Sequence, residues 1–416
     1  MEIHEANLQL GVIGNGSFGA LVDTRGRVVW ACLPAFDGDP AFCALLSPRG
    51  HEGGDFGVEL EDFSHSEQCY LPNTAILRTV LHDRHGGALE IVDFAPRWRQ
   101  NERFFRPVSI VRRITPLAGS PRIRVRARPL ADWGARVPEH TWGSNHVRWL
   151  LPGFTLRLTT DVPVRFVRDG LPFVLTHRLH LVLGPDEPLA RSISGYVDEA
   201  LVRTQDYWRE WVRYLSIPLE WQDAVIRSAI TLKLCQYEDS GAIIAAMTTS
   251  IPEAPGSARN WDYRYCWLRD AAFVVRALNR LGATRSMEEF LRYIFNLATH
   301  DGSLQPLYGI GFEERLDEQE VESLAGYRGM GPVRRGNLAW IQKQHDVYGS
   351  VVLASTQLFF DQRLVDPGDM HTFSRLEPLG ERAFALYDVP DAGLWEFRGR
   401  AEVHTYTAAM CWAACD

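Results

Sequence analysis

Hydrophobic and polar residues alternate along the first part of the chain with the period of two that β-strands show. The segment 122–128 is the clearest example, because Ile123, Val125 and Ala127 alternate with four arginines. One face of this strand is expected to be buried and the other to face solvent, with an arginine-lined groove as the alternative. Strand-like runs on either side of turn sequences predict two hairpins, at 20–22 with 27–30 and at 76–81 with 88–94.

Further strand-like runs follow at 153–160 and 173–183. Helical spacing of apolar residues begins near Gly195 and continues to the end of the chain. One predicted helical stripe consists of Trp221, Val225, Ala229, Leu232 and Cys235. We therefore predict a multidomain β-plus-α protein, with an antiparallel β-sandwich over 1–192, a helical linker over 193–218 and a helical domain over 219–416. Long connections with glycine and proline, such as 248–260 and 326–337, are where function is expected to concentrate.

Composition places the chain among ordinary globular proteins. It has 416 residues, of which 46% are hydrophobic and 23% charged, so it can bury large cores. The formal net charge is −8 and the basic residues are scattered, which argues against nucleic acid or an anionic membrane and favours a neutral substrate. The N-terminus has no signal-peptide pattern and no apolar run approaches a membrane span, so a cytoplasmic location is expected. The oligomeric state stays open.

The seven cysteines indicate neither a disulfide framework nor a zinc site, because their number is odd and no CxxC spacing occurs. Cys266, Cys411 and Cys415 are expected to be small core residues. We predict no metal and no cofactor.

The glycines at 14, 16 and 19 form the GxGxxG pattern of dinucleotide-binding proteins. Such a site needs a helix directly after the last glycine, whereas this chain continues with residues 20–22, a turn and another strand-like run. We interpret the glycines as parts of a β-turn, and an oxidoreductase stays the alternative enzyme class.

The segment 259–270, RNWDYRYCWLRD, combines groups that bind sugars. Sugar rings stack their C–H faces on aromatic side chains, and their hydroxyls pair with carboxylates and guanidinium groups. The segment offers Trp261, Tyr263, Tyr265 and Trp267 for the first role and Asp262, Arg264, Arg269 and Asp270 for the second. Apolar residues at helical spacing follow, and Gly282 is placed to end the helix, so Arg269 and Asp270 are expected at a helix N-terminus. The alternative is that Asp270 complements the helix dipole, Arg269 pairs with it and the aromatics are core.

Glu396 is the clearest candidate for a catalytic acid. It follows Leu394 and Trp395, and apolar neighbours raise the pKa of a carboxyl group and keep it protonated. Glycosidic cleavage needs such an acid together with a second carboxylate that activates water or attacks. The alternative is that Glu396 simply pairs with Arg398 on a loop.

A third polar patch lies at 331–348, GPVRRGNLAWIQKQHDVY. Gly336 is expected to let the backbone come close to another segment. Gln344, His345 and Asp346 are compatible with a metal or base cluster, but the helical periodicity around them favours solvated or structural roles.

These three separated segments resemble, in order, the motifs of glycoside hydrolase family 15, which contains glucoamylases, glucodextranases and bacterial trehalases. The resemblance covers 11–416. It implies an N-terminal β-sandwich followed by an (α/α)6 barrel. It also implies that Trp267, Arg269 and Asp270 hold the terminal glucose, that Tyr263 lies against the reacting sugar and that Arg334 faces the substrate. Glu396 matches the family's general acid, and Leu394 and Trp395 match residues that wall the sugar subsite.

The family's general base lies in the C-terminal part of its barrel, and this chain stops at Asp416 inside a predicted helix. Residues 406–415 are apolar on more than one side and lack a helix stop signal, which also suggests truncation. We therefore expect about the first half of the barrel, a general base beyond Asp416 and a chain that is nearly inactive. Glu313, Glu314 or Asp346 are alternatives for the base, although no sequence feature places them opposite the acid.

The resemblance implies an inverting, exo-acting hydrolase of terminal α-linked glucose, with a maltooligosaccharide or α-glucan substrate as the leading interpretation. A trehalase of the same family is the first alternative. A carbohydrate-binding chain that retains sugar without cleaving it is the alternative from another class.

Overall fold

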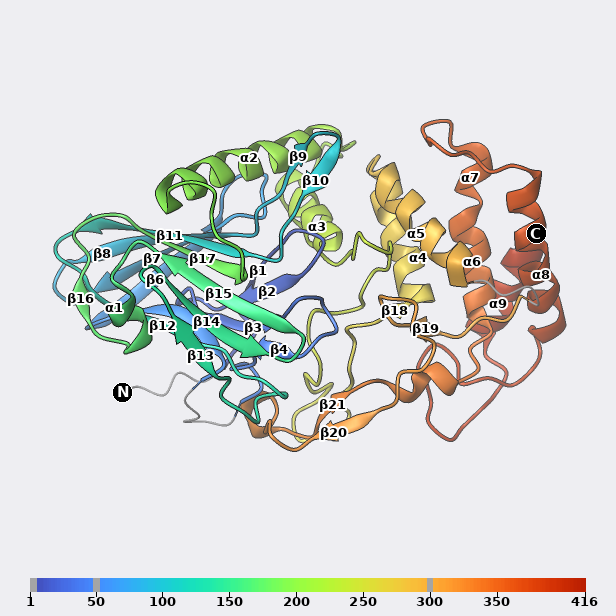
Figure 1. Cartoon of the computed structure of the whole chain (residues 1–416). Helices are drawn as coiled ribbons and strands as arrows, with labels where there is room; N and C mark the ends of the chain where they lie inside the picture. The colour runs from blue at the N-terminus through green and yellow to red at the C-terminus, as the bar shows by residue number, and fades with distance from the viewer. Residues whose placement is uncertain (1–5, 48–52, 298–301) are drawn as a thin grey trace.

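The computed structural model describes residues 6–47, 53–297 and 302–416. Figure 1 shows a β-rich N-terminal half and a helical C-terminal half, with long loops and short strands between them. This order of β-structure and then helices confirms the coarse fold predicted from the sequence.

Two antiparallel sheets form the N-terminal half. One has the strand order β1-β2-β3-β5-β12-β16, with β4 paired to β3, and the other has the order β13-β14-β15-β17-β11-β8-β7-β6. The first comprises β1 (Gly11–Gly14), β2 (Gly19–Val22), β3 (Val28–Cys32), β4 (Pro40–Phe42), β5 (Asp55–Leu60), β12 (Arg122–Arg128) and β16 (Phe173–Val174). The second comprises β6 (Phe63–Tyr70), β7 (Leu77–Asp83), β8 (Ala88–Phe94), β11 (Ile110–Ala118), β13 (His140–Trp142), β14 (His146–Leu151), β15 (Phe154–Thr160) and β17 (Leu179–Pro185). A separate hairpin joins β9 (Trp98–Gln100) to β10 (Arg103–Phe105), and α1 (Val164–Arg168) lies between β15 and β16.

The two sheets enclose one hydrophobic core. Side chains from both, such as Val22 and Phe56 on one side and Leu89 and Ile114 on the other, belong to a single buried cluster. Both predicted hairpins are present, and β12 buries Ile123 and Val125. The run at 173–183 is not one strand, because β16 and β17 belong to different sheets.

The glycines of the GxGxxG pattern lie in the β1–β2 hairpin. Gly16 has a φ of 85°, and β2 follows directly in this fully described stretch, so no helix starts there. A residue with positive φ in a tight turn is the ordinary use of glycine. The geometry does not fit a dinucleotide site and removes the basis of the oxidoreductase alternative.

Helix α2 (Ile193–Arg213) packs on the outer face of the eight-stranded sheet. Its residues Val197, Ala200 and Leu201 share a buried cluster with Val92 and Val182. Helix α3 (Gln222–Leu234) follows. The predicted stripe that starts at Trp221 is wrong at its first member, because Trp221 precedes the helix and is exposed.

The C-terminal helices share a second large core. They are α4 (Leu268–Arg280), α5 (Thr284–Leu297), α6 (Asp346–Ser355), α7 (Gln357–Phe360), α8 (Met370–Leu386) and α9 (Thr405–Cys415). The loops between them carry β18 (Cys266–Trp267) paired with β19 (Leu307–Tyr308), β20 (Gln319–Val321) paired with β21 (Val333–Arg335), and short 3-10 helices at Tyr327–Gly329 and Leu338–Ile341. In the described part of the chain, no helix is both long and apolar enough to cross a membrane.

Buried ion pairs join the β-sandwich to the end of helix α3 and to the loop that follows it. Arg97, the residue before β9, donates to both oxygens of Glu238 at 2.8 and 2.9 Å, and the Nζ of Lys233 lies 2.5 Å from Glu238. The cysteines are all free; Cys266 and Cys411 are buried as predicted, whereas Cys415 is exposed, which corrects that prediction.

Candidate active site

The segment from Trp261 to Asp270 is anchored by a buried ion pair. Arg264 donates to both carboxylate oxygens of Asp262, at 2.8 and 2.7 Å, and both side chains are fully buried. Arg264 also donates to the carbonyl of Gly38 at 2.8 Å and lies over the ring of Trp133. Asp262 and Arg264 therefore hold the segment against the sandwich, and the expectation that they bind sugar hydroxyls is wrong.

Trp267, Arg269 and Asp270, at the end of this segment, contribute side chains to the candidate site. Trp267 pairs with Leu307 in the short β18–β19 ladder and is the residue before α4. Helix α4 begins at Leu268, so Arg269 and Asp270 lie in its first turn, and Gly282 follows its end with a φ of 85°. The ladder and the helix start together fix the direction in which Trp267 and Arg269 project.

Glu396 lies in a tight loop between α8 and α9. Asp391 organises this loop, because its buried carboxylate accepts from the backbone N–H of His345 and Gly393 and from the hydroxyl of Thr407. Glu396 has a φ of 55°, which is costly for a residue with a side chain and persists only where the surroundings enforce it. Such enforced backbone conformations concentrate at functional sites.

Three donors from two other segments converge on one oxygen of Glu396. Its Oε1 accepts from the indole Nε1 of Trp267 at 2.5 Å, from Nε2 of Gln344 at 3.3 Å and from Nη2 of Arg269 at 3.5 Å. Among the described residues, none donates a hydrogen bond to its Oε2. Because Oε1 is occupied by donors, Oε2 is the oxygen that can carry a proton toward a bound molecule.

Several effects of opposite sign act on the pKa of Glu396, and burial is the largest of them. Desolvation raises the pKa of Glu396, the hydrogen bond from Trp267 and the charge of Arg269 oppose this, and Asp270 adds to it. Burial also raises the pKa of Tyr263, to about 12, so its hydroxyl is a neutral donor near pH 7. A carboxyl group whose pKa is raised in this way is suited to general acid catalysis.

Arg269 is held by two further groups. Its Nη1 donates to Gln344 at 2.8 Å and to the buried carboxylate of Asp346, the first residue of α6, at 3.2 Å. Burial raises the pKa of Asp346, and the charge of Arg269 counteracts that effect. Gln344, His345 and Asp346 are buried, so the prediction of solvated roles is wrong and the structural role is the one observed.

These side chains surround a cavity of about 690 Å³, within the range of small-molecule sites. Every site residue that the resemblance implies lines it: Tyr263, Trp267, Arg269, Asp270, Arg334, Leu394, Trp395 and Glu396. Tyr265, which the sequence also offered for stacking on sugar, is buried and does not line it. Sequence reasoning missed other lining residues, including Glu253, Asn337, Gln342 and Phe397. Glu313, Glu314 and Asp346 do not line this cavity.

One wall of the cavity is a stack of two guanidinium groups on an indole. Arg334 and Arg398 lie 4.8 and 3.7 Å from the ring centroid of Trp261. Arg398 donates to both oxygens of Glu318, at 3.1 and 2.7 Å, so the alternative in which Glu396 pairs with Arg398 is wrong. Arg334 donates to the carbonyls of Ala258 and Asn260, so part of its hydrogen-bonding capacity is used to hold the wall.

Gly336 shows the close backbone approach predicted for it. A Cβ atom at this position would lie 2.0 Å from the carbonyl oxygen of Asp317, and its φ is 75°. Its N–H bonds to Asp262 and to the hydroxyl of Tyr265. The loop that carries Arg334 is thereby fixed to the anchor of the Trp261–Asp270 segment.

An aromatic-walled cavity with a protonatable carboxyl and nearby guanidinium groups is the type of site found in carbohydrate-active enzymes. Comparison with known proteins agrees with that class. The model for Glycosyl hydrolases family 15 matches residues 221–416, and the model for a trehalase-like N-terminal domain matches residues 6–141. The chain belongs to glycoside hydrolase family 15.

Similar proteins include trehalases from three organisms. The chain is 32% identical to the trehalase of Mycobacterium tuberculosis, over 95% of this chain and 62% of the relative. It is 30% identical to the trehalase of Thermoplasma volcanium, over 98% of this chain and 65% of the relative. Trehalase 1 of Sulfolobus acidocaldarius is 30% identical, over 98% of this chain and 70% of the relative. The chain thus spans slightly less than two thirds of the first two relatives.

Proposed function

We propose that this chain carries the acid and the glucose-binding side of an inverting α-glucoside hydrolase, and that trehalose is its substrate. The observation that carries the proposal is the convergence of Trp267, Arg269 and Gln344 on one oxygen of Glu396 at the cavity wall. This arrangement leaves the other oxygen to protonate the glycosidic oxygen as the bond to the anomeric carbon breaks.

The remaining side chains of the cavity supply binding. Trp267, Tyr263 and Trp395 offer aromatic surface for the C–H faces of glucose, and Leu394 extends that surface. Asp270 is exposed at the start of α4 and Arg269 lies beside it, so both are placed to bond to hydroxyls. Arg334 faces the cavity from β21, although its bonds to backbone carbonyls make its main contribution one of positioning.

The choice of trehalose corrects the leading interpretation from the sequence. That interpretation favoured maltooligosaccharides or α-glucans, with trehalose as an alternative within the same family. The curated relatives, which match nearly the whole chain, are named trehalases, and one matched domain is trehalase-like. A neutral glucoside also suits a cavity that offers both carboxylates and guanidinium groups.

The finer features of the fold belong to the same proposal. Helices α4, α5, α6, α8 and α9 share one core, which supports assigning them to an (α/α)6-type barrel. Residues 219–416 are the proposed catalytic region, 193–218 the linker and 1–192 the sandwich. Among the described residues, no general base is assigned.

The reaction is tested by the products that a protein carrying both this chain and the general base forms from trehalose. Its two glucose units are joined through both anomeric carbons in the α configuration, so inversion at one of them releases one β-glucose and one α-glucose. Proton NMR of freshly formed product should show equal amounts of both anomers. Two α-glucose molecules would indicate retention and contradict the proposed mechanism.

The acid is tested with a variant and an activated substrate. In the same base-carrying protein, Glu396→Gln should abolish trehalose hydrolysis but affect α-glucosyl fluoride much less, because fluoride leaves without protonation. Glu402→Gln is the matched control, because Glu402 is exposed and lies in the same loop. Saturable trehalose binding by calorimetry without any product would favour the binding-only alternative.

A further inference from the structure

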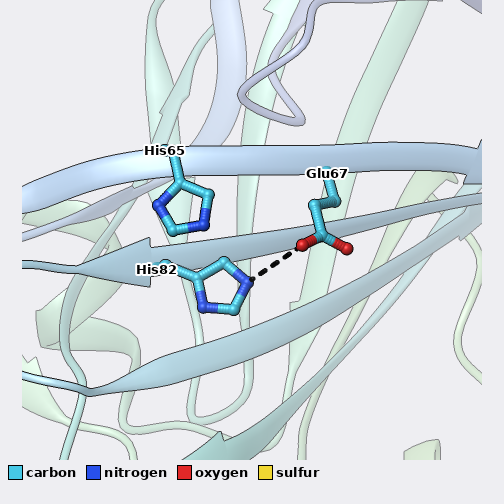
Figure 2. Close-up of side chains that lie close together, drawn as sticks. All are labelled: His65, Glu67 and His82. Atoms are coloured by element: carbon cyan, nitrogen blue, oxygen red, sulfur yellow. Dashed lines mark ion pairs between the residues drawn. The ribbon is translucent and has the colours of Figure 1, made fainter.

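Three possible metal ligands meet on the surface of the β-sandwich, on strands β6 and β7. They are His65, Glu67 and His82 (Figure 2), and one ligating atom from each lies within 4.8 Å of the other two. We propose that these residues bind a divalent transition-metal ion, of which Zn²⁺ is the representative, and that the ion clips β6 to β7. This inference is independent of the proposed function.

A β-bulge brings the two histidines together. Phe63 pairs with Asp83, but the following pair is His65 with His82, so Ser64 is an extra residue on β6. If the pairing continued regularly from Phe63 and Asp83, Ser64 would stand opposite His82 and His65 opposite Leu81. Bulges re-aim side chains in this way and are stable features of a fold. Glu67 lies two residues after His65, on the same face of the strand.

The candidate ligand atoms are close together, but the two rings must turn before they can coordinate one ion. The imidazole rings are stacked with centroids 4.4 Å apart and an interplanar angle of 2°, so their in-plane nitrogen lone pairs do not yet converge on one point. Nε2 of His82 lies 4.0 Å from Oε1 of Glu67. Ligands around Zn²⁺ lie about 2.0–2.2 Å from the metal, which puts neighbouring ligand atoms roughly 3.3 Å apart. Because His65 and Glu67 are exposed, side-chain rotation alone can close the remaining gap.

His82 Nε2 is available as a ligand atom. It is shielded from solvent, and among the described residues it has no hydrogen-bond partner, a state that it shares with Nε2 of other histidines such as His146 and His180. What distinguishes His82 is that two other possible ligands lie beside it. Coordination to a metal between His82, His65 and Glu67 would satisfy Nε2 of His82.

The ligand types select the class of metal. Imidazole nitrogen suits zinc, copper and nickel, whereas Mg²⁺ and Ca²⁺ prefer sites made of oxygen ligands. Two imidazoles and one carboxylate leave at least one coordination position for water. A catalytic part in sugar cleavage is not implied, because β6 and β7 lie far from helices α4 to α9 in Figure 1.

The position of the site indicates its effect. Strand β6 is the edge strand of the eight-stranded sheet, and among the described strands it pairs only with β7. An ion held by both strands would stabilise this edge, because a ligand that binds only the folded chain stabilises it by mass action. Cysteine spacing predicted no metal, and the site is not apparent from the sequence, since the histidines are far apart and the bulge is not visible there.

The test is zinc titration by calorimetry on the 416-residue chain after treatment with EDTA. The unsubstituted chain should bind Zn²⁺ saturably, and His82→Ala and His65→Ala should each lower the affinity at least about tenfold, since losing even an outer-shell partner costs that much. The controls are His85→Ala, in the turn after β7, and Cys69→Ser, an exposed thiol on β6. Both should retain the affinity of the unsubstituted chain.

A thermal measurement guards against a folding defect. In EDTA, His65→Ala should unfold at the same temperature as the unsubstituted chain, because His65 is exposed. Zinc should raise the unfolding temperature of the unsubstituted chain and of His85→Ala, but not of His65→Ala. Absence of zinc binding, unchanged affinity in both histidine variants, or loss of binding in Cys69→Ser would each overturn the proposal.

Discussion

The indole Nε1 of Trp267 lies 2.5 Å from Oε1 of Glu396, although the two residues are 129 positions apart in the chain. Trp267 is fixed by the β18–β19 ladder, and Glu396 is fixed by a loop that Asp391 organises. The hydrogen bond therefore joins two independently positioned elements. It also occupies one oxygen of the Glu396 carboxylate, so the other oxygen is the one that can carry a proton.

Substitutions of Trp267 and Asp270, two neighbours of Glu396, should shift the pKa of Glu396 in opposite directions. Trp267→Phe deletes the donor that lowers the pKa of Glu396, so that pKa should rise. Asp270→Asn deletes a negative charge that raises it, so that pKa should fall. Carbon-13 NMR titration of the Glu396 carboxyl, assigned by its absence in Glu396→Gln, measures both without requiring activity. Shifts of the same sign would contradict the assigned causes.

Glu396→Gln should stabilise the protein near neutral pH. Because the folded-state pKa is raised above the ordinary value of 4.5, the protonated carboxyl contributes stability that is fully present below that value. This contribution is lost as the pH rises through the folded-state pKa. Glutamine stays neutral throughout, so the variant should exceed the unsubstituted chain in unfolding temperature at about pH 7, with a smaller difference at about pH 4.

The control for that comparison is Glu402→Gln. Glu402 is exposed and paired with Arg400, so neutralising it should change stability little. A gain in Glu396→Gln that is equally large at both pH values would show that the charge of Glu396 is not the cause.

Local sequence patterns predicted those helix ends and strands that are determined by residues close together in the chain. The start of α4 after Trp267 and its end before Gly282 were readable, because helical periodicity and capping are local. The strand β12 was readable from its period of two. The split of residues 173–183 into β16 and β17 was not, since it depends on which sheet each half joins.

The site was predictable in part for the same reason. Tyr263 lines the cavity, as does Trp261, whereas Asp262 and Arg264 between and after them are buried on the other side. An extended segment turns successive side chains to opposite sides, and this alternation could have separated binding residues from anchoring ones. The partners of Glu396 could not be inferred locally, because Gln344 and Trp267 come from distant elements.

Trp395→Ala should weaken sugar binding without lowering stability. Trp395 lines the cavity and is 70% exposed, so it contributes little to the core. Loss of one aromatic contact should cost about 0.5–1.5 kcal/mol of binding free energy, or roughly two- to tenfold in the dissociation constant for trehalose. Calorimetry measures the constant. The matched control is Trp412→Ala on α9, which is 66% exposed and does not line the cavity; an equal loss there would refute a specific role for Trp395.

Asp262→Asn should destabilise the protein strongly, although Asp262 does not line the cavity. Arg264 is fully buried and receives its charge compensation from Asp262, so the variant leaves a buried guanidinium without its counterion. Breaking such a pair costs about 3–5 kcal/mol of unfolding free energy, which urea denaturation would measure.

Asp317→Asn is the control that tests whether burial is the cause of the large loss of stability. Asp317 forms an ion pair with Arg315, and both side chains are exposed, so the loss should be only about 0–1 kcal/mol. If both variants lost the same amount, burial would not be what makes the Asp262–Arg264 pair important. The large difference expected here also separates two roles within 259–270. The buried pair of Asp262 and Arg264 holds the segment against the sandwich. Trp267 and Arg269 are thereby kept in position to contact Glu396.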